Sequence, residues 1–532
     1  MAGRTVYIET FGCQMNELDS ELVSGQLRAL GYAFTEEPDR ADVVLYNTCS
    51  VRDHAEQKVR SRLGELRERR ASDPGLVVGV LGCMAERDGR DMIARFPVID
   101  VLCGPGELDK LPALLDNAVR TRGAIVSDPD SARERFVALQ GGASRRSATL
   151  AAAADSLELL DLSRAVSPDD HSGSAYVRIT RGCNKFCTYC VVPHTRGAEV
   201  HRPPDHIVDE CKRLADAGVV EVTLLGQTVN HYRFEHGAVV TMGGIVQPQK
   251  GRAYAGGHRR DPFEGERVTT FAGLLRRIHE EAPGIARLRF VTSYPRDFGD
   301  DVLEVIRDSP RICRYLHVPA QSGSDAVLAR MNRGYTVGEY LEFIDRARGV
   351  LDEPEKGRPL SIAGDIIAGF CAETEDDHRA TAALLRRVRY KNCFIFRYSP
   401  RPGTAAFDRL ADDVPEEDKR RRVNELLALQ QSISDEVSRE QVGREFEVFV
   451  QGVSAHEAKR EPSRGRVPLT VGGRASEREA SAPVVQLSAR TEGDLIVVFD
   501  CPAGRSGAEL VGSLVRVKIT AARGLTLFGV LP

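Results

Sequence analysis

The chain has 532 residues, 42% of them hydrophobic, and a formal net charge of −4. This length predicts more than one domain, and we expect three. The near-balanced charge excludes a generally basic surface, so any RNA binding would depend on local patches. We find no secretory signal and no apolar run near the about 20 residues of a membrane helix. We therefore expect a soluble, cytoplasmic protein that does not enter a membrane.

Residues 5 to about 120 alternate apolar strand patterns with amphipathic helix patterns. This alternation predicts an α/β domain over residues 1–125 with a doubly wound parallel sheet. Cys13, Cys49 and Cys83 each follow one of the first three predicted strands. Ligands bind at the carboxyl edge of such sheets, so we expect the three cysteines to converge there. On position alone, three buried structural thiols are the alternative.

Residues 126–172 are loose in composition and predict a linker. Residues 173–405 contain six further strand patterns, each followed by a helix pattern, which indicates a full or partial (β/α)6 barrel. Loops after the strands of such a barrel carry its chemistry. A stretch at about 233–268 interrupts the pattern, and we expect it to be a flexible surface insertion.

The pattern of strands and helices changes in the C-terminal part of the chain. Residues 406–440 predict a connecting helix, and residues 441–532 contain five short strand patterns with glycine turns. These strands indicate a small β-barrel, which is a common RNA-binding scaffold. A basic insertion at about 455–482 interrupts it.

The segment "RGCNKFCTYC" places Cys183, Cys187 and Cys190 on one loop after the first strand of the central domain. Thiolates select zinc, Cu(I) or iron–sulfur clusters. A structural zinc site needs four ligands, and His194 could supply the fourth. The spacing favours three corners of a [4Fe-4S] cube, whose fourth iron then stays open to bind another molecule.

The C-x3-C-x2-C spacing with Tyr189 before its last cysteine resembles the radical S-adenosylmethionine signature. The segments "FGCQMNELDSE", "NTCSVRDHAEQKV" and "GVLGCM" narrow the resemblance to the methylthiotransferases. The segments "GCNKFCTYCVVPHTRG", "LLGQTVN", "QSGSD", "YSPRPGTAA" and "DDVPEEDK" are similar to the MiaB-type branch of that family. The resemblance covers almost the whole chain apart from the linker and the two insertions. The C-terminal barrel is similar to a TRAM domain.

The resemblance implies two [4Fe-4S] clusters and S-adenosyl-L-methionine. Cys183, Cys187 and Cys190 would hold the cluster that binds S-adenosylmethionine and generates a deoxyadenosyl radical. The other three cysteines would hold an auxiliary cluster that carries the sulfur. The implied reaction places a methylthio group on carbon 2 of N6-isopentenyladenosine, at position 37 beside the tRNA anticodon.

The resemblance also implies further site residues. The residues expected to bind S-adenosylmethionine are Tyr189, Gly226, Gln227, Gln321, Ser322, Gly323, Ser324 and Glu373. Arg196 and Arg401 are candidates for contacts with tRNA phosphates. Before Glu373 the chain reads Cys371-Ala372 where the family usually reads Pro-Gly, which puts the geometry of that turn in doubt.

The expected partners are an isopentenylated tRNA, an electron donor such as a flavodoxin or ferredoxin, and a sulfur source, with the chain acting as a monomer. Two alternatives keep the chemistry and change the substrate, to threonylcarbamoyladenosine in tRNA or to an aspartate of a ribosomal protein. A third alternative is a non-catalytic zinc or iron–sulfur protein that binds RNA.

Overall fold

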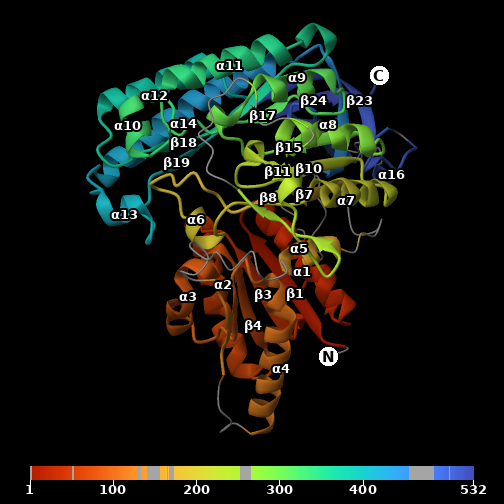
Figure 1. Cartoon of the computed structure of the whole chain (residues 1–532), viewed down its shortest axis with the longest axis vertical. Coiled ribbons are helices and arrows are strands. Elements are labelled where there is room, and N and C mark those ends of the chain that lie inside the picture. Colours follow the sequence, from red (N-terminus) through yellow and green to blue (C-terminus); the bar gives the residue numbers. More distant parts are fainter. Residues whose placement is uncertain are drawn as a thin grey trace, which may run out of the picture.

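Three regions follow one another along the chain, and Figure 1 shows the N-terminal sheet below a central barrel. The computed structural model describes residues 3–50, 53–128, 134–140, 156–164, 166, 173–251, 260, 265, 267–454, 485–502 and 504–532. The predicted insertion at 455–482 lies outside these residues. None of the helices in the described ranges combines the length and the hydropathy that crossing a bilayer requires.

The N-terminal region is a six-stranded parallel sheet in the order β2-β1-β3-β4-β5-β6. Its strands are β1 (Thr5–Phe11), β2 (Ala33–Phe34), β3 (Val43–Thr48), β4 (Val77–Gly82), β5 (Val101–Cys103) and β6 (Phe136–Ala138). The helices α1 (Gln14–Ala29) and α4 (Leu111–Ser127) pack on one face, and α2 (Asp53–Ser72) and α3 (Cys83–Arg95) on the other. Successive residues of β3 join opposite cores, as in Leu45 and Tyr46, so both faces are buried. The predicted doubly wound sheet is confirmed.

The stretch expected to be a linker is partly structured. β6 adds a strand to the sheet beyond residue 125. The helix α5 (Ser156–Leu162) buries Leu157 and Leu160 in the N-terminal core. A three-residue strand and a seven-residue helix are too short to give a clear periodic pattern, which is why the composition alone indicated a linker.

The central region is a partial barrel of six parallel strands in two groups, β16-β10-β7 and β17-β18-β19. The strands are β7 (Ser174–Arg178), β10 (Glu221–Leu225), β16 (Arg287–Phe290), β17 (Tyr315–His317), β18 (Ser361–Ala368) and β19 (Asn392–Arg397). A parallel bridge between Leu288 and Ile312 links the two groups. The covering helices are α7 (Pro204–Asp216), α8 (Phe271–Glu281), α9 (Asp300–Asp308), α10 (Asp325–Arg330), α11 (Val337–Leu351) and α12 (Glu375–Val388). The predicted partial barrel is confirmed.

The insertion expected to be flexible contains paired strands in its described part. β11 (Arg233–Glu235) pairs with β15 (Val268–Thr270), and β12 (Thr241–Met242) pairs with β13 (Ile245–Val246). β14 (Gln249–Lys250) pairs with β9 (Val200–His201), which follows the cysteine loop. The insertion therefore contacts the segment that follows the cysteine loop.

The C-terminal region begins after α13 (Ala405–Arg409) with the long helix α14 (Glu416–Arg439). A closed five-stranded barrel follows, in the order β20-β21-β22-β24-β23. Its strands are β20 (Glu445–Val453), β21 (Gln486–Thr491), β22 (Ile496–Asp500), β23 (Leu514–Arg523) and β24 (Thr526–Val530). This architecture fits the predicted TRAM-like barrel.

The turn between β21 and β22 closes the amino-terminal end of the central barrel. Arg287 and Arg289, on β16, donate hydrogen bonds to the carbonyl oxygens of Arg490 (2.8 Å) and Glu492 (3.0 Å). Lys391, just before β19, forms an ion pair of 2.5 Å with Asp494. The opposite, carboxyl-terminal end of the barrel is therefore the end that carries the loops expected to do the chemistry.

Candidate functional site

Strands β1, β3 and β4 bring the cysteines that follow them together by register. Phe11 pairs with Thr48, and Thr48 pairs with Gly82, so β1, β3 and β4 end at one level. Cys13, Cys49 and Cys83 follow these ends within two residues. The thiols of Cys13 and Cys49 share a hydrogen bond, and the charge of Cys13 acts on Cys83. The expected convergence is thus present in the structure.

Glycines before two of these cysteines make room for the site. A Cβ on Gly12 would lie 2.9 Å from the Cβ of Cys49, and one on Gly82 would lie 2.7 Å from the carbonyl oxygen of Thr48. Gly82 also has φ +88°, a conformation that disfavours any other residue. Both positions therefore require glycine for the backbone to approach this closely.

The thiols of this site lie where an anion is stabilised. Cys13 caps α1 and Cys83 opens α3, and helix N-termini favour thiolates. The hydrogen bond from Cys49 lowers the pKa of Cys13 to about 6, with burial opposing and the positive charge of Arg196 adding to this shift. Ser50, next to Cys49, has a buried hydroxyl without a hydrogen-bond partner among the described residues. Burial raises the pKa of Cys83, so the acidity is specific to Cys13. Soft sulfur donors gathered at helix N-termini fit an iron–sulfur cluster.

Arg196, the candidate for a phosphate contact, lies at this cysteine site. It follows the short helix α6 (Val192–Thr195) of the central region, yet its side chain is only 7% exposed. Its guanidinium pairs with Asp19 of α1 at 2.8 Å and hydrogen-bonds Cys83. Asp19 also accepts from Arg178 of β7, and Arg178 binds Asp161 of α5 at 2.7 Å. This buried ion network fixes the N-terminal sheet against the barrel.

The second cysteine site lies on the loop after β8 (Thr180–Arg181). Gly182 has φ +68° and packs so tightly on the carbonyl groups of Gly197 and Ala198 that a Cβ would overlap them. Cys183 lies 3.6 Å from the hydroxyl of Thr228. The charges of the three cysteines act on one another, so the loop holds their thiols close together. Burial raises the pKa of Cys183 to about 11.

The segment after α10 clamps this loop from the other half of the barrel. Thr188 donates to the carbonyl oxygens of Met331 (3.0 Å) and Arg330 (2.8 Å), and Asn332 donates to that of Phe186 (3.0 Å). The loop also accepts from Ala406 of α13 through Thr188. Segments far along the chain thereby fix the conformation of the loop that carries the three cysteines.

Arg333 is a site residue that the sequence analysis missed. It is 6% exposed and donates to the Sγ of Cys187 at 3.4 Å. Its guanidinium lies 4.6 Å from the centre of the Tyr294 ring and 5.1 Å from that of Tyr335. A buried cation beside the cysteines offsets the negative charge of a thiolate-ligated cluster. The segment "MNRGYT" carries it, but surface and buried arginines look alike in a sequence.

Three buried polar atoms at the carboxyl ends of neighbouring strands have no hydrogen-bond partner within the described ranges. They are Thr180 Oγ1 after β7, Gln227 Oε1 after β10 and Ser293 Oγ after β16. Unsatisfied buried polar atoms are costly, so their convergence indicates a polar ligand at this edge. Gly226 lets β10 approach Thr180 closely, because a Cβ there would overlap the threonine hydroxyl. These groups suit the predicted S-adenosylmethionine site beside Cys183.

Several other predicted residues have structural partners in place of an open site. Gly323 packs against α12, where a Cβ would lie 2.5 Å from the Ala380 carbonyl oxygen. Ser322 and Ser324 belong to the same turn, in which Ser324 caps α10. Gln321 has φ +73° and extends the pairing beyond β17 through Ile366. The "QSGS" turn is thus explained by packing, and a cofactor role for it stays a prediction.

Glu373 and Arg401 are likewise held by neighbours. Arg422 of α14 donates to the Glu373 carboxylate at 3.0 Å, and so does the backbone of Gly369 at 2.9 Å. The guanidinium of Arg401 binds Glu56 of α2 at 2.8 Å and is 13% exposed. Both groups have partners within the protein, and their roles toward S-adenosylmethionine and phosphates stay predictions. Tyr189 packs its ring edge-on to Phe370, with centroids 6.4 Å apart, at the side of the cysteine loop.

The spacing of the cysteines separates a cluster from a single ion. Zinc–sulfur bonds of about 2.3 Å would hold tetrahedral ligands about 3.8 Å apart. Among the described residues, neither cysteine triplet, with or without His194, brings its ligand atoms within 4.8 Å of one another. The predicted zinc alternative would require these ligand atoms to move closer together.

Glu199, His201 and His231 are the group that does meet this distance in the described part of the chain. Nδ1 of His231 lies 2.9 Å from both Glu199 oxygens, and Nδ1 of His201 accepts from the backbone of Arg233. Burial lowers the pKa of His201 to about 4. The backbone of Glu199 donates to Asn184 of the cysteine loop. This network joins the insertion to that loop.

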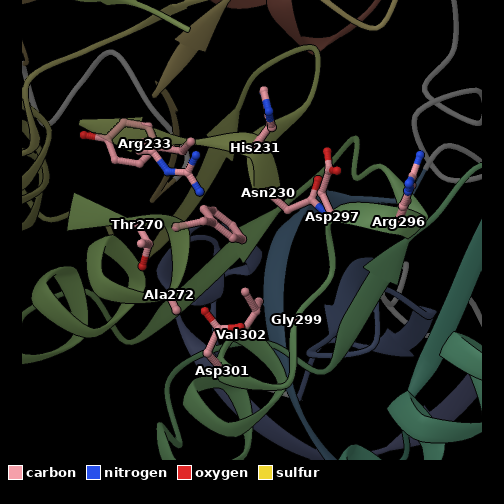
Figure 2. Close-up of a pocket in the computed structure, with 12 residues that line it drawn as sticks. Asn230, His231, Arg233, Thr270, Ala272, Arg296, Asp297, Gly299, Asp301 and Val302 are labelled. Carbon is pink, nitrogen blue, oxygen red and sulfur yellow. The ribbon is translucent and has the colours of Figure 1, made fainter. Parts of the chain in front are cut away.

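Figure 2 shows a pocket between the loops after β10 and β16, with Arg233, Arg296, Asp297 and Asp301 among its lining residues. Asp297 forms an ion pair of 2.6 Å with Lys185 of the cysteine loop. The pocket is thus linked to the site by this pair, although no cysteine lines it.

Two family models match the chain, and each covers one of the two cysteine triplets. The model of the Radical SAM superfamily matches residues 177–385, and that of the uncharacterized protein family UPF0004 matches residues 5–104. A radical S-adenosylmethionine methyltransferase from Kitasatospora setae has a TM-score of 0.48, with 13% identity over 76% of this chain and 74% of its own. With the partial barrel and its three-cysteine loop, the superfamily match makes this chain a radical SAM enzyme.

Two curated relatives carry the same name, tRNA-2-methylthio-N(6)-dimethylallyladenosine synthase. The protein from Rhodopirellula baltica is 42% identical over 99% of this chain and 95% of its own length. The protein from Chlorobium luteolum is 38% identical over 99% of this chain and 97% of its own. The chain belongs to the tRNA-2-methylthio-N(6)-dimethylallyladenosine synthase family. It therefore uses a [4Fe-4S] cluster and S-adenosylmethionine.

Proposed function

We propose that the chain methylthiolates carbon 2 of N6-isopentenyladenosine at position 37 of tRNA. Two cysteine triplets, on two domains locked together by buried ion pairs, carry this proposal. Relatives at 42% and 38% identity over nearly the full chain bear the name of that activity. A reaction that uses two clusters accounts for the second triplet.

In this proposal the loop cysteines Cys183, Cys187 and Cys190 hold one cluster. When bound, this cluster and S-adenosylmethionine supply the radical that removes hydrogen from carbon 2 of the adenine. The chain orients S-adenosylmethionine through Thr180, Gln227 and Ser293, whose buried oxygens lack other partners among the described residues. An aromatic C–H offers no practical proton to a side-chain base, so the protein's work is positioning and exclusion of water.

Cys13, Cys49 and Cys83 hold a second [4Fe-4S] cluster that provides the sulfur. Arg196 carries positive charge from the central region into this site, beside Cys83. The ion pairs of Asp19 with Arg178 and Arg196 keep the separation of the two sites constant. Both sites act on the same carbon atom of the substrate, so the distance between them must be fixed.

The C-terminal barrel contributes RNA affinity through phosphate contacts, which makes binding salt-dependent. The proposal includes an electron donor such as a flavodoxin or ferredoxin, a source of replacement sulfur, and a monomeric chain.

The test is an anaerobic reaction of reconstituted protein with S-adenosylmethionine, a reductant and isopentenylated tRNA. Nucleosides from the digested RNA are examined by mass spectrometry. A methylthio adduct on isopentenyladenosine is the expected result. Deoxyadenosine without this adduct would overturn the proposed substrate and redirect the assay to threonylcarbamoyladenosine and to the ribosomal aspartate.

A further inference from the structure

The inner face of the second half-barrel carries aromatic side chains that the activity described so far does not use. Side chains alternate between the two faces of a strand. Leu316 of β17, Ile366 of β18 and Ile395 of β19 pack outward into the core under the helices. Their neighbours His317, Asp365, Phe394 and Phe396 therefore point to the inside of the partial barrel.

These inward residues form a continuous surface, which we call the aromatic wall: His317, Phe394 and Phe396. The rings of Phe394 and Phe396 are stacked at 17°, with centroids 6.4 Å apart. His317 meets Phe394 edge-on at 6.5 Å, and its Nε2 lies 3.3 Å from the Asp365 carboxylate. Phe394 pairs in register with Asp365, and Phe396 with Ile367, so the wall follows the strands.

The wall is unusually open for a strand interior. The Phe394 side chain is 45% exposed, although its neighbours in the strand, Cys393 and Ile395, are buried. Contiguous apolar patches at a surface mark binding sites, and the rings of His317 and Phe396 extend the exposed face of Phe394. Barrel enzymes bind their substrates at the carboxyl ends of the strands, beside the loops, and Phe396 lies near the carboxyl end of β19.

The wall extends from the cysteine loop toward the closed end of the barrel. Ile367, beside Phe396, packs in one small cluster with Tyr189 of the loop and Phe370. Further down, Tyr315 contacts Lys391, whose ion pair with Asp494 closes the barrel. A flat group lying on the wall would therefore have one end toward Tyr189 of the cysteine loop and the other toward the closed end of the barrel.

The unpartnered polar oxygens and the exposed aromatic rings are divided between the two half-barrels. The unsatisfied oxygens of Thr180, Gln227 and Ser293 all belong to the β7-β10-β16 half. The aromatic wall belongs to the β17-β18-β19 half. Two different molecules, one polar and charged and one flat and apolar, would fit this division.

We propose that the aromatic wall binds the isopentenylated adenine of the tRNA substrate, with the base stacked on it and the five-carbon chain covering Phe394. The inference rests on the proposed function and names the surface that distinguishes a prenylated from an unprenylated base. Bases that react are taken out of their stack, and aromatic side chains replace the stacking that is lost. A five-carbon alkenyl group has no polar atoms, so an exposed phenyl ring is the surface that recognises it.

The test measures binding of two anticodon stem-loops to reconstituted holoenzyme, one with isopentenyladenosine at position 37 and one with adenosine. Wild type should bind the prenylated RNA at least about tenfold more tightly, as expected for a buried alkyl group. Phe394→Ala should bring this ratio close to one, and Phe394→Leu should keep part of the preference. Phe34→Ala, on the edge strand β2 of the N-terminal sheet, is the matched control and should keep the wild-type ratio.

The failures of the two proposals are distinguishable. If wild type adds no methylthio group to isopentenylated tRNA, the proposed function is wrong. If wild type does so while Phe394→Ala keeps both its iron content and the full binding ratio, only the aromatic wall is wrong. A wild type without any preference for the prenylated stem-loop overturns the wall as well. Iron content monitors folding of each variant, and Phe394→Leu gives the answer should the alanine variant lose it.

Discussion

The two cysteine triplets reach similar arrangements by opposite routes. Cys183, Cys187 and Cys190 lie within eight residues, and contacts from the segment Arg330–Arg333 and from α13 hold their loop. The other triplet spans seventy residues, and the pairing of β1, β3 and β4 holds it. One site is local in sequence and depends on distant support. The other is distant in sequence and depends on the regular register of a sheet.

This contrast teaches where each site is vulnerable. A parallel sheet fixes the level of its strand ends, so the N-terminal site should tolerate changes in the surrounding loops and fail when the strand ends move. A loop has no such register, so the second site should fail when its clamp is removed. Both sites share one device, a buried arginine beside a cysteine, in Arg196 and Arg333.

The largest expected effects separate the two sites by function. Cys183→Ala should reduce cleavage of S-adenosylmethionine to background, because the cluster that binds it loses a ligand. Cys49→Ala should block methylthiolation while some uncoupled cleavage continues. Deoxyadenosine and methylthio nucleoside are measured in the same reactions. Equal and complete loss of cleavage in both variants would contradict the division of labour.

A matched pair of glycine substitutions tests the two routes directly. Gly82→Ala and Gly182→Ala each add a Cβ at positive φ, just before a cysteine, where it meets backbone carbonyl groups. Each should cost about 3 kcal/mol from strain and overlap. We expect Gly82→Ala to lose the N-terminal cluster and Gly182→Ala the loop cluster, as measured by iron content and electron paramagnetic resonance. Loss of both clusters in either variant would show that the sites are not assembled independently.

The two arginines should act on their own clusters. Removing a positive charge disfavours the reduced, more negative state, so Arg333→Met should make the potential of the loop cluster more negative. Arg196→Met should do the same for the N-terminal cluster, and each should lower activity about 10- to 100-fold, as substitutions around metal ligands do. Redox titration of each cluster is the measurement, and Arg333→Lys, which keeps the charge, is the control. A shift in both potentials from one substitution would contradict separate action.

The smallest expected effect lies outside both sites. Ala372 has φ +56°, a conformation that glycine adopts without strain. Ala372→Gly should raise the free energy of unfolding by about 1 kcal/mol, measured by denaturant unfolding, and leave both clusters unchanged. Destabilisation would mean that Cys371 and the neighbouring contacts require the strained turn.

The fold was predictable wherever hydrophobic periodicity was strong. The alternating strands and helices indicated the sheet and the partial barrel, and the short strands near the C-terminus indicated the closed barrel. Short elements were not predictable in this way. β6 and α5 are too short to show a periodic pattern, and contacts with residues far along the chain stabilise them. The paired strands of the insertion were missed for the same reason.

For the site, the sequence predicted the cysteines and the ends of the strands that carry them. It could not predict which charged side chains would be buried. Arg196 was expected at the RNA and lies beside Cys83, because its partner Asp19 belongs to a different domain. Arg333 was not singled out, and Glu373 proved to be paired with Arg422. Long-range ion pairs leave no periodic trace in a sequence.

Through the turn between β21 and β22, the C-terminal barrel also stabilises the central barrel. Arg287, Arg289 and Lys391 are buried because this turn supplies their carbonyl and carboxylate partners. A chain shortened before residue 441 would leave these three cations without those partners, and buried charges that lose their partners cost several kcal/mol. Such a chain would lose the residues that close the central barrel together with the C-terminal barrel. Deleting the C-terminal barrel would therefore also change the catalytic domain.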